Sequence, residues 1–411
     1  MKGFSKLRIL CLFLADSYES YTGGERQFIE ICKIWKRLGN EIHIIANTLG
    51  IMLCKRFGLT AKFYALKEPS VKIAGLEDFV VVREMLNRVP DVNFDFIYCP
   101  EERFPYILAS VILKRKIKVP LICSVNLLSP EDTGIASSLK QVFAYSEART
   151  GVKYVWAIPG RFLFFFKKML RNFFFLKKMD IVFSVSPFIK KLLVKLGIDE
   201  RRLFVVNVGV DRSLIQKIAS QSLGDKSFDA CFLGNIIPRK GVIDLIKAWK
   251  IVNVERPKAK LLIIGKGSGT YFEKVKALVK NYGLLKNVIF SGFVPEREKY
   301  TLLSQSKIFV FPSYLEGNPL AICEALSCGI PVIAYDFPYY REIYGDALVY
   351  VKKGDFSELA NAILSLLKDE LFKEKMRNKY VELSKNLDWE NIAKYELEII
   401  QKCLLVKNLK G

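Results

Sequence analysis

Short apolar runs rich in β-branched residues alternate with longer segments of helical period along nearly the whole chain. This alternation constrains the fold more than any other feature, because it is typical of parallel α/β domains in which each strand is followed by a helix. The pattern breaks between residues 211 and 228, where the composition turns polar and no strand is indicated, and then starts again. The sequence therefore predicts two α/β domains in tandem.

The length of 411 residues agrees with two or three domains, each large enough to bury its own core. We expect an N-terminal Rossmann-like domain at residues 1–210, a linker at 211–228 and a C-terminal Rossmann-like domain at 229–385. Residues 386–411 are predicted as a C-terminal helix that could pack back on the N-terminal domain. Strands are predicted at residues 7–15, 41–46, 94–98, 120–125, 181–185, 203–206, 230–233, 261–264, 288–290, 308–311, 331–334 and 348–351.

Hydrophobic residues make up 51% of the chain and charged residues 26%, which excludes an intrinsically disordered protein. The nine cysteines form no Cys-x-x-Cys pair and the single histidine is His43. We therefore expect buried thiols in a reducing, cytoplasmic compartment and no structural zinc site. The apolar run at residues 9–15 precedes an aspartate and is predicted as a first strand rather than a signal peptide. No segment has the roughly 20 consecutive apolar residues of a membrane-spanning helix.

The formal net charge of +22 indicates an anionic partner. Residues 1–210 carry 33 Lys or Arg and 19 Asp or Glu, so the N-terminal half is the more basic. Nucleic acid, an anionic membrane and an acidic substrate are all compatible with this charge. The sequence shows no RRM, KH, zinc-finger or helix-turn-helix pattern, so a nucleic-acid partner is not expected.

Two glutamates eight positions apart, Glu316 and Glu324, follow the predicted strand at 308–311. Pro319 between them is well suited to the first turn of a helix. The free N–H groups of such a helix bind anions such as a diphosphate, and the two carboxylates can accept hydrogen bonds from sugar hydroxyls. The spacing alone is weak evidence, because pairs of solvent-exposed glutamates are common.

The surrounding segment, residues 312–332, resembles the retaining glycosyltransferases of the large nucleotide-sugar-dependent family, known as glycosyl transferases group 1 or family 4. The hallmark of that family is a Glu, seven intervening residues and a second Glu, followed by a Gly-x-Pro-Val strand. The resemblance implies the GT-B fold, which is two tandem Rossmann-like, doubly wound domains facing across a cleft. The matching residues are Pro312, Ser313, Glu316, Gly317, Pro319, Leu320, Glu324, Ala325, Gly329, Pro331 and Val332.

Residues 232–241 resemble the family's strand and loop that grip the donor diphosphate, beginning with Gly234 after the strand. Lys240 fits the family's lysine, whereas Asn235 stands where the family has an arginine. Arg239 could supply the second charge. Cations are unfavourable at a helix N-terminus, so an anion bound there would resolve the conflict with the helix dipole.

Other segments resemble the family in the expected order. Gly23 and Gly24 match a Gly-Gly loop that lets the backbone approach the donor phosphates and acceptor. Residues 265–269 match a Gly-x-Gly turn. Phe293 lies in a segment that follows the nucleotide base in the family, and we leave a core position open as the alternative.

One departure from the family concerns a histidine that many members carry near the reacting sugar, where this chain has residues 123–127. Ser124 or Asn126 could orient the acceptor or the sugar instead. His43 lies within a predicted strand and is interpreted as a packed core residue.

Residues 161–178 combine seven phenylalanines and six cations in one predicted helix. An interfacial helix, with its rings in the acyl boundary of an anionic membrane and its cations on the headgroups, accommodates both. The alternative is a core helix whose long basic side chains extend to solvent. The expected membrane contacts are Phe164, Phe165, Lys167, Lys168, Arg171, Phe174 and Lys178.

The resemblance implies a retaining, hexosyl-type transferase that takes a UDP- or GDP-sugar as substrate and needs no further cofactor. A glycan or membrane glycolipid is the expected acceptor, at the cytoplasmic face of a membrane. No Asp-x-Asp triplet occurs, so no metal is expected. A non-catalytic nucleotide-sugar-binding subunit remains the alternative. The implied catalytic residues are Lys240, Arg239 and Glu316, and the implied donor-binding residues are Gly23, Gly24, Gly234, Asn235, Phe293, Gly317, Asn318, Pro319, Leu320 and Glu324. The resemblance also implies that Glu316 contacts hydroxyls of the donor sugar and that Glu324 contacts the ribose.

Overall fold

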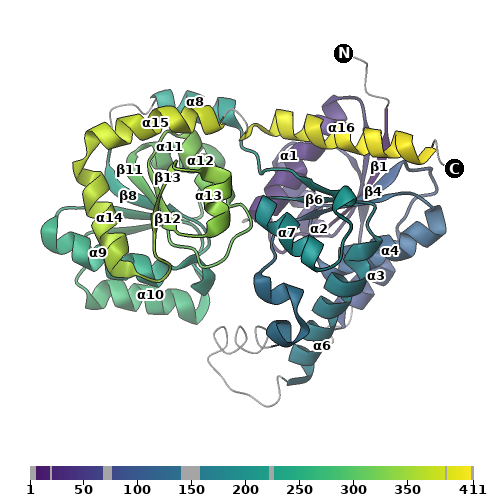
Figure 1. Ribbon diagram of the computed structural model, residues 1–411, viewed down its shortest axis with the longest axis horizontal. Helices are drawn as coiled ribbons and strands as arrows, with labels where there is room; N and C mark the ends of the chain where they lie inside the picture. Colours follow the sequence, from purple (N-terminus) through teal and green to yellow (C-terminus); the bar gives the residue numbers. More distant parts are fainter. Residues whose placement is uncertain are drawn as a thin grey trace. The chain divides into compact units, whose positions relative to one another are not determined.

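The computed structural model describes residues 6–18, 21–67, 76–139, 158–221, 226–384 and 387–408. The chain divides into two units, which are described separately. The first contains Met1–Asn207 together with Trp389–Gly411, and the second contains Val208–Asp388. Figure 1 shows that helices enclose the strands of each unit. The predicted GT-B type of fold, with two Rossmann-like sheets, is confirmed.

The first unit contains a seven-stranded parallel sheet in the order β3-β2-β1-β4-β5-β6-β7. Six of these strands lie within or beside predicted ones. The strand β3 was not predicted, because it lies at the sheet edge with its side chains half-buried or exposed and lacks an apolar run. The strands are β1 (Arg8–Phe13), β2 (Glu41–Ala46), β3 (Lys62–Ala65), β4 (Phe96–Cys99), β5 (Leu121–Val125), β6 (Ile181–Ser184) and β7 (Leu203–Val205).

The helices of the first unit begin with α1, which is closed at its N-terminus by a capping box between Thr22 and Glu25. The C-terminal helix α16 packs on α1, and the indole Nε1 of Trp35 donates to the carbonyl of Ala393 at 2.9 Å. Both ends of the chain therefore belong to one unit (Figure 1). The helices are α1 (Gly23–Arg37), α2 (Thr48–Arg56), α3 (Glu77–Asn87), α4 (Phe104–Ile117), α6 (Ile158–Met169), α7 (Pro187–Lys195) and α16 (Trp389–Asn408).

The second unit contains a six-stranded parallel sheet in the order β10-β9-β8-β11-β12-β13. In both sheets the order reverses beside the first strand of the unit, which is where open α/β sheets bind ligands. All six strands overlap predicted ones. They are β8 (Phe228–Leu233), β9 (Leu261–Ile264), β10 (Val288–Gly292), β11 (Ser306–Phe311), β12 (Val332–Tyr335) and β13 (Leu348–Val351).

The polar stretch predicted as a linker contains the helix α8, which packs on α11 and α12 within the second unit. Its buried residues Ile215 and Ile218 form an apolar stripe three positions apart that the polar composition obscures. The helices are α8 (Arg212–Gln221), α9 (Val242–Glu255), α10 (Gly269–Asn281), α11 (Glu296–Ser304), α12 (Leu320–Ser327), α13 (Pro338–Tyr344), α14 (Phe356–Lys368) and α15 (Glu370–Ser384).

Candidate functional site

Three side chains of the second unit converge on one carboxylate oxygen. Glu316 lies in the loop between β11 and α12, and its Oε1 accepts hydrogen bonds from Lys240 Nζ at 2.7 Å and Arg239 Nη1 at 2.8 Å. The hydroxyl of Ser313 donates to the same oxygen at 2.5 Å. The structure thus brings the three implied catalytic residues, Lys240, Arg239 and Glu316, into direct contact.

The charges in this cluster do not balance. Burial alone would raise the pKa of Glu316, but the charges of Lys240 and Arg239 outweigh it and the pKa is lowered, so the carboxylate stays ionised. Burial, together with the charge of Arg239, also lowers the pKa of Lys240 despite its bond to Glu316. Two cations therefore share one carboxylate, and an additional anion would stabilise the excess positive charge.

Glycines allow the loops around this cluster to approach one another closely. Gly241 has φ +68°, and a Cβ there would lie 1.9 Å from the carbonyl oxygen of Pro312. A Cβ on Gly265, with φ +142°, would lie 2.0 Å from the carbonyl oxygen of Gly234. The loops after β8, β9 and β11 therefore meet through their backbones.

The loop from Gly317 to Pro319 is buried and leads into α12. No side chain caps the N-terminus of this helix, where Pro319 is the N-cap residue and Leu320 the first helical residue. The Asn318 side chain is held from the other side, because the Tyr344 hydroxyl donates to its Oδ1 at 2.7 Å. The helix N-terminus beside Glu316 can therefore receive an anion.

The second glutamate of the motif, Glu324, is buried on α12. Its Oε1 accepts from Lys299 Nζ at 2.5 Å and from the Tyr300 hydroxyl at 3.4 Å, both on α11. Lys299 was not predicted as a site residue. The sequence pattern that could have indicated its burial is its place four positions before Leu303, on the apolar face of α11.

Two further implied donor residues lie on loops after strands of this sheet. Asn235 follows β8 and is exposed. Phe293 follows β10 and is 37% exposed, which does not favour the alternative of a core position.

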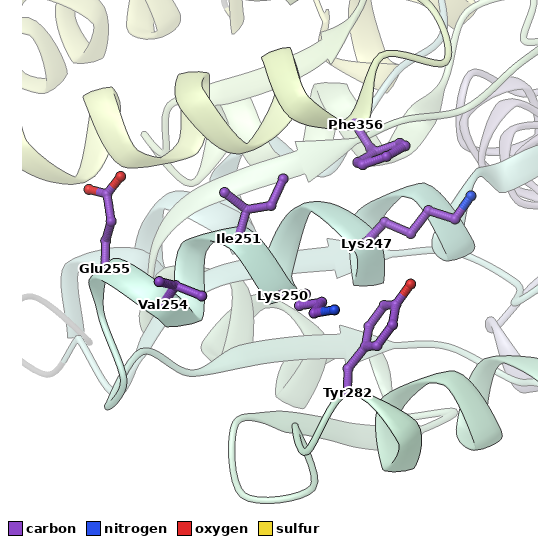
Figure 2. A pocket seen from close by; sticks show the side chains of 7 residues that line it. All are labelled: Lys247, Lys250, Ile251, Val254, Glu255, Tyr282 and Phe356. Atoms are coloured by element: carbon purple, nitrogen blue, oxygen red, sulfur yellow. The ribbon is translucent and has the colours of Figure 1, made fainter.

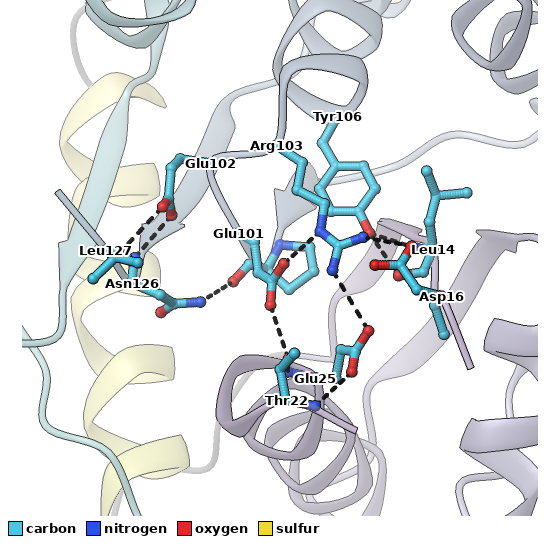
Figure 3. Close-up of polar contacts among 12 residues, drawn as sticks. Leu14, Asp16, Thr22, Glu25, Glu101, Glu102, Arg103, Tyr106, Asn126 and Leu127 are labelled. Carbon is cyan, nitrogen blue, oxygen red and sulfur yellow. Dashed lines mark hydrogen bonds and ion pairs between the residues drawn. The ribbon is translucent and has the colours of Figure 1, made fainter. Parts of the chain in front are cut away.

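In the first unit, the Gly-Gly loop meets the loops after β4 and β5 (Figure 3). A Cβ on Gly24 would lie 2.5 Å from Glu101 Oε1 and 2.7 Å from Asn126 Nδ2, so this position requires glycine unless those side chains move. Asn126 Nδ2 donates to the carbonyl of Pro100 at 3.1 Å. Gly23, Gly24 and Asn126 therefore share the carboxyl end of this sheet.

Three charged residues here were not found from the sequence. Glu102 accepts the backbone N–H groups of Asn126 at 2.9 Å and Leu127 at 3.2 Å, and so fixes the loop after β5. Arg103 Nε donates to Glu101 at 2.8 Å. The sequence pattern that could have indicated them is the run Glu-Glu-Arg at residues 101–103, which follows Pro100 at the end of β4.

Two carboxyl groups at this end, those of Glu25 and Glu102, have raised pKa values. Burial, aided by the charge of Glu101, raises the pKa of Glu25 to about 7, although the N–H of Thr22 and the charge of Arg103 oppose the shift. Burial also raises the pKa of Glu102, against the charge of Arg171 and the N–H of Asn126. Glu25 can therefore hold a proton near neutral pH.

Two polar residues lie in the core rather than at this end. Ser124 is within β5, is buried, and its hydroxyl bonds the Tyr98 hydroxyl at 2.9 Å. His43 is buried in β2 between Tyr64 and Glu41, in agreement with its interpretation as a packed residue.

The predicted interfacial helix is only partly as expected. It is α6 followed by one π-helical segment, η3 (Leu170–Phe175), and a short 3₁₀ turn. Lys167 and Lys168 do not face a surface: they are buried in ion pairs with Asp78 and Asp132 respectively. The sequence could not show these partners, which lie 89 and 36 positions away.

The remaining side chains of this segment divide between core and surface. Arg171 and Phe165 are half-buried, and Arg171 Nε donates to Asn172 at 2.7 Å. Four phenylalanines are more than half exposed, and the lysines at its end are exposed too. The exposed residues are Phe162, Phe164, Phe166, Phe174, Lys177 and Lys178.

A pocket of about 440 Å³ lies elsewhere on the second unit, between α9, Tyr282 and Phe356 (Figure 2). None of the implied site residues lines it. Within the described ranges, no group of three or more His, Cys, Asp or Glu side chains could hold a metal ion. No helix in those ranges is long and apolar enough to cross a membrane.

Comparisons with known proteins identify the family. Residues 21–214 match the family model "Glycosyltransferase Family 4", and residues 215–386 match "Glycosyl transferases group 1". The O-antigen chain mannosyltransferase B of Escherichia coli is 28% identical over 162 residues, which are 39% of this chain and 42% of that protein. The alpha-galactosylglucosyldiacylglycerol synthase of Streptococcus pneumoniae is 24% identical over 317 residues, which are 71% of this chain and 83% of that protein.

Solved structures agree in fold. The Anabaena protein HepE in complex with UDP and glucose has a TM-score of 0.70 at 19% identity, covering 96% of this chain and 100% of that one. WaaG, a glycosyltransferase involved in lipopolysaccharide biosynthesis, has a TM-score of 0.67 at 15% identity, covering 96% and 99%. The chain spans less than half of the length of the first curated relatives that it matches, with 42%, 30% and 29% of those proteins covered.

Proposed function

The chain belongs to the group 1 glycosyl transferases with the GT-B fold, and from that premise we propose that it moves a sugar from a nucleotide-diphosphate sugar to an acceptor hydroxyl with retention of anomeric configuration. One observation carries the proposal. Two largely buried cations, Lys240 and Arg239, share a single carboxylate beside the uncapped N-terminus of α12. Such a cluster has an unbalanced positive charge where a diphosphate would bind.

The difficult step in this reaction is the departure of an anionic nucleoside diphosphate from an oxocarbenium-like carbon. Lys240, Arg239 and the N–H groups of α12 would stabilise the negative charge that develops on the leaving group, without moving to do so. Glu316 uses Oε1 for protein contacts, and its Oε2 has no hydrogen-bond partner among the described residues. That second oxygen would accept from hydroxyls of the donor sugar.

The first unit would receive the acceptor. Asn126, held by Pro100 and by the Glu102-bound loop, lies beside Gly24 and would orient the acceptor hydroxyl. Ser124 does not share this role in the proposal, because its hydroxyl is bonded in the core. The name of the streptococcal relative describes the synthesis of a glycosyl diacylglycerol. We therefore propose a membrane glycolipid or lipid-linked glycan as the acceptor.

Membrane attachment would use the exposed part of residues 162–178. Phe164 and Phe174 are 58% and 60% exposed and would enter the acyl boundary, while Lys177 and Lys178 would meet anionic headgroups at the cytoplasmic face. The double variant Phe164→Ser, Phe174→Ser should lose most of its flotation with vesicles that contain phosphatidylglycerol. Leu285→Ser, an exposed apolar residue of the second unit, is the matched control. Equal flotation of the double variant and the wild type would contradict attachment by this segment.

Transfer can be tested directly with UDP-, GDP-, ADP- and TDP-sugars, by following release of the nucleoside diphosphate with and without a membrane-lipid extract. We expect slow release from one donor, faster release with lipid, no effect of EDTA, and a product whose anomeric configuration by NMR matches that of the donor. An inverted product would contradict retention.

A non-catalytic nucleotide-sugar-binding subunit is the second candidate. The observations that favour it are Asn235 in place of the family's arginine and the lack of the family's histidine at residues 123–127. Binding of a donor without release, in the presence of every acceptor extract, would support this candidate and contradict transfer.

A further inference from the structure

A buried lysine reaches the second glutamate of the donor motif. Lys299 on α11 and Glu324 on α12 form an ion pair of 2.5 Å, and their side chains are only 7% and 5% exposed. Neither the family motif nor the proposed chemistry requires a cation at this place.

The stability of the fold does not explain why the chain has a buried ion pair here. Desolvation of both charges offsets most of their attraction, and apolar replacements of such pairs are often neutral or stabilising. Removal of one partner is strongly unfavourable, however, because it leaves the other charge buried and unpaired. Glu324 therefore depends on Lys299 for its orientation.

The pair fixes which carboxylate oxygen remains available. Oε1 of Glu324 takes the bonds from Lys299 and the weaker, 3.4 Å bond from the Tyr300 hydroxyl, which also donates to Glu296 at 3.1 Å. The thiols of Cys323 and Cys328 also interact electrostatically with Glu324. Oε2 makes no hydrogen bond within the described part of the chain.

Glu316 shows the same arrangement, since its Oε1 takes all the protein donors and its Oε2 takes none. In each case a cation holds the carboxylate by one oxygen and leaves the other for a ligand. Different cations therefore hold the two glutamates in the same way, each by one carboxylate oxygen.

We propose that Lys299 is a positioning residue that makes the donor site select ribose over 2′-deoxyribose, by holding Glu324 so that its Oε2 meets the ribose hydroxyls. The inference rests on the proposed donor site and goes beyond it in assigning Lys299. A carboxylate that is free to rotate would meet the diol in several orientations and would distinguish the two sugars poorly, since specificity depends on a buried polar group being left unpaired by the wrong ligand.

The test measures affinity by calorimetry for two matched pairs, UDP with 2′-deoxy-UDP and GDP with 2′-deoxy-GDP. Loss of a hydrogen bond to a charged group corresponds to about a tenfold preference of the wild type for the ribonucleotide. In Lys299→Met we expect that preference to fall to about onefold to twofold, through weaker binding of the ribonucleotide. Lys276→Met, an exposed lysine of α10, is the control and should keep the wild-type preference.

A merely structural role for Lys299 would weaken both members of a pair equally and leave the ratio unchanged, which would overturn the proposal. If Lys299→Met does not fold, Lys299→Gln keeps a hydrogen-bond donor without the charge and should give an intermediate ratio; an unchanged ratio there would also overturn it. A wild type that binds ribo and deoxy forms equally would overturn this inference but leave the donor site standing. A wild type that binds none of the four nucleotides would overturn the proposed function as well.

Discussion

Glu316 and Glu25 are the same residue type, each buried beside a glycine-containing loop at the carboxyl end of a Rossmann-like sheet, yet their pKa values shift in opposite directions. Burial acts on both. At Glu316 the cations Lys240 and Arg239 outweigh it and lower the pKa, whereas at Glu25 burial and the neighbouring Glu101 outweigh Arg103 and raise the pKa to about 7. The charge of the neighbours, rather than the fold, decides the protonation state.

The difference fits two tasks. The end of the second unit has cations in excess and suits an anion such as a diphosphate. The end of the first unit gathers Asp16, Glu25 and Glu101 around Arg103, and suits a neutral ligand that offers hydroxyl protons. Two domains of one architecture can thus bind opposite kinds of ligand through a few side chains at the same edge of the sheet.

The largest expected effect comes from removing the excess charge of the second unit. Lys240→Met should lower kcat for sugar transfer by roughly 100- to 1000-fold, as expected for the loss of one preorganised group that stabilises the leaving charge. Steady-state kinetics with the active donor measure this. Lys247→Met is the control, because Lys247 lies over the Phe356 ring in the separate pocket on α9. A loss below tenfold in Lys240→Met would contradict the role of Lys240.

Glu316→Gln should remove the ionised carboxylate that Lys240 and Arg239 share in the second unit. The variant leaves two cations without their carboxylate and should lose about 3–5 kcal/mol of unfolding free energy at pH 7. Because the folded pKa of Glu316 is lowered, its contribution is present above pH 4.5 and is lost as the pH falls through the folded value. Urea unfolding should therefore show that the unfolding free energies of the variant and the wild type become equal at acidic pH. A difference in unfolding free energy that stays constant with pH would contradict an ionised Glu316 paired with the two cations.

Glu25→Gln should show the opposite pH dependence. The folded pKa of Glu25, about 7, lies above the ordinary value of 4.5, so its favourable contribution is complete below pH 4.5 and is lost as the pH rises to about 7. Relative to the wild type, the variant should gain up to about 3 kcal/mol between pH 4 and pH 8. The measurement is urea unfolding at both pH values. If the stability of the variant relative to the wild type did not increase from pH 4 to pH 8, the comparison with Glu316 would fail.

Asn126→Ala gives the smallest expected effect. The loop backbone stays bound to Glu102, so only the amide beside Gly24 is lost, and kcat should fall about tenfold with donor affinity unchanged. Calorimetry with the donor measures the donor affinity, and steady-state kinetics with the acceptor measure kcat. An unchanged kcat would contradict the proposed role of Asn126 in orienting the acceptor hydroxyl.

Most of the fold follows from local signals. Buried parallel strands are short apolar runs, so every strand of both sheets except β3 could be predicted. The edge strand β3 has half-buried and exposed side chains and gives no such run. The helix α8 was not predicted either, because its buried stripe consists of Ile215 and Ile218 and its other residues are mostly polar.

The candidate site divides in the same way. Glu316, Lys240 and Arg239 lie in segments with a family pattern and could be named from the sequence. Lys299 and Glu102 act through contacts made by tertiary packing, to Glu324 and to the loop at Asn126 and Leu127. Partners far apart in the sequence also explain why Lys167 and Lys168 are buried in ion pairs rather than placed at a surface.

Calorimetry can compare a nucleoside diphosphate with the corresponding monophosphate, and so measure whether Lys240, Arg239 and the N-terminus of α12 form a diphosphate site. We expect the wild type to bind UDP or GDP at least tenfold more tightly than UMP or GMP, and Lys240→Met to lose most of this preference. Equal binding of the two nucleotides by the wild type, or a preference that survives in Lys240→Met, would contradict a diphosphate site at these residues.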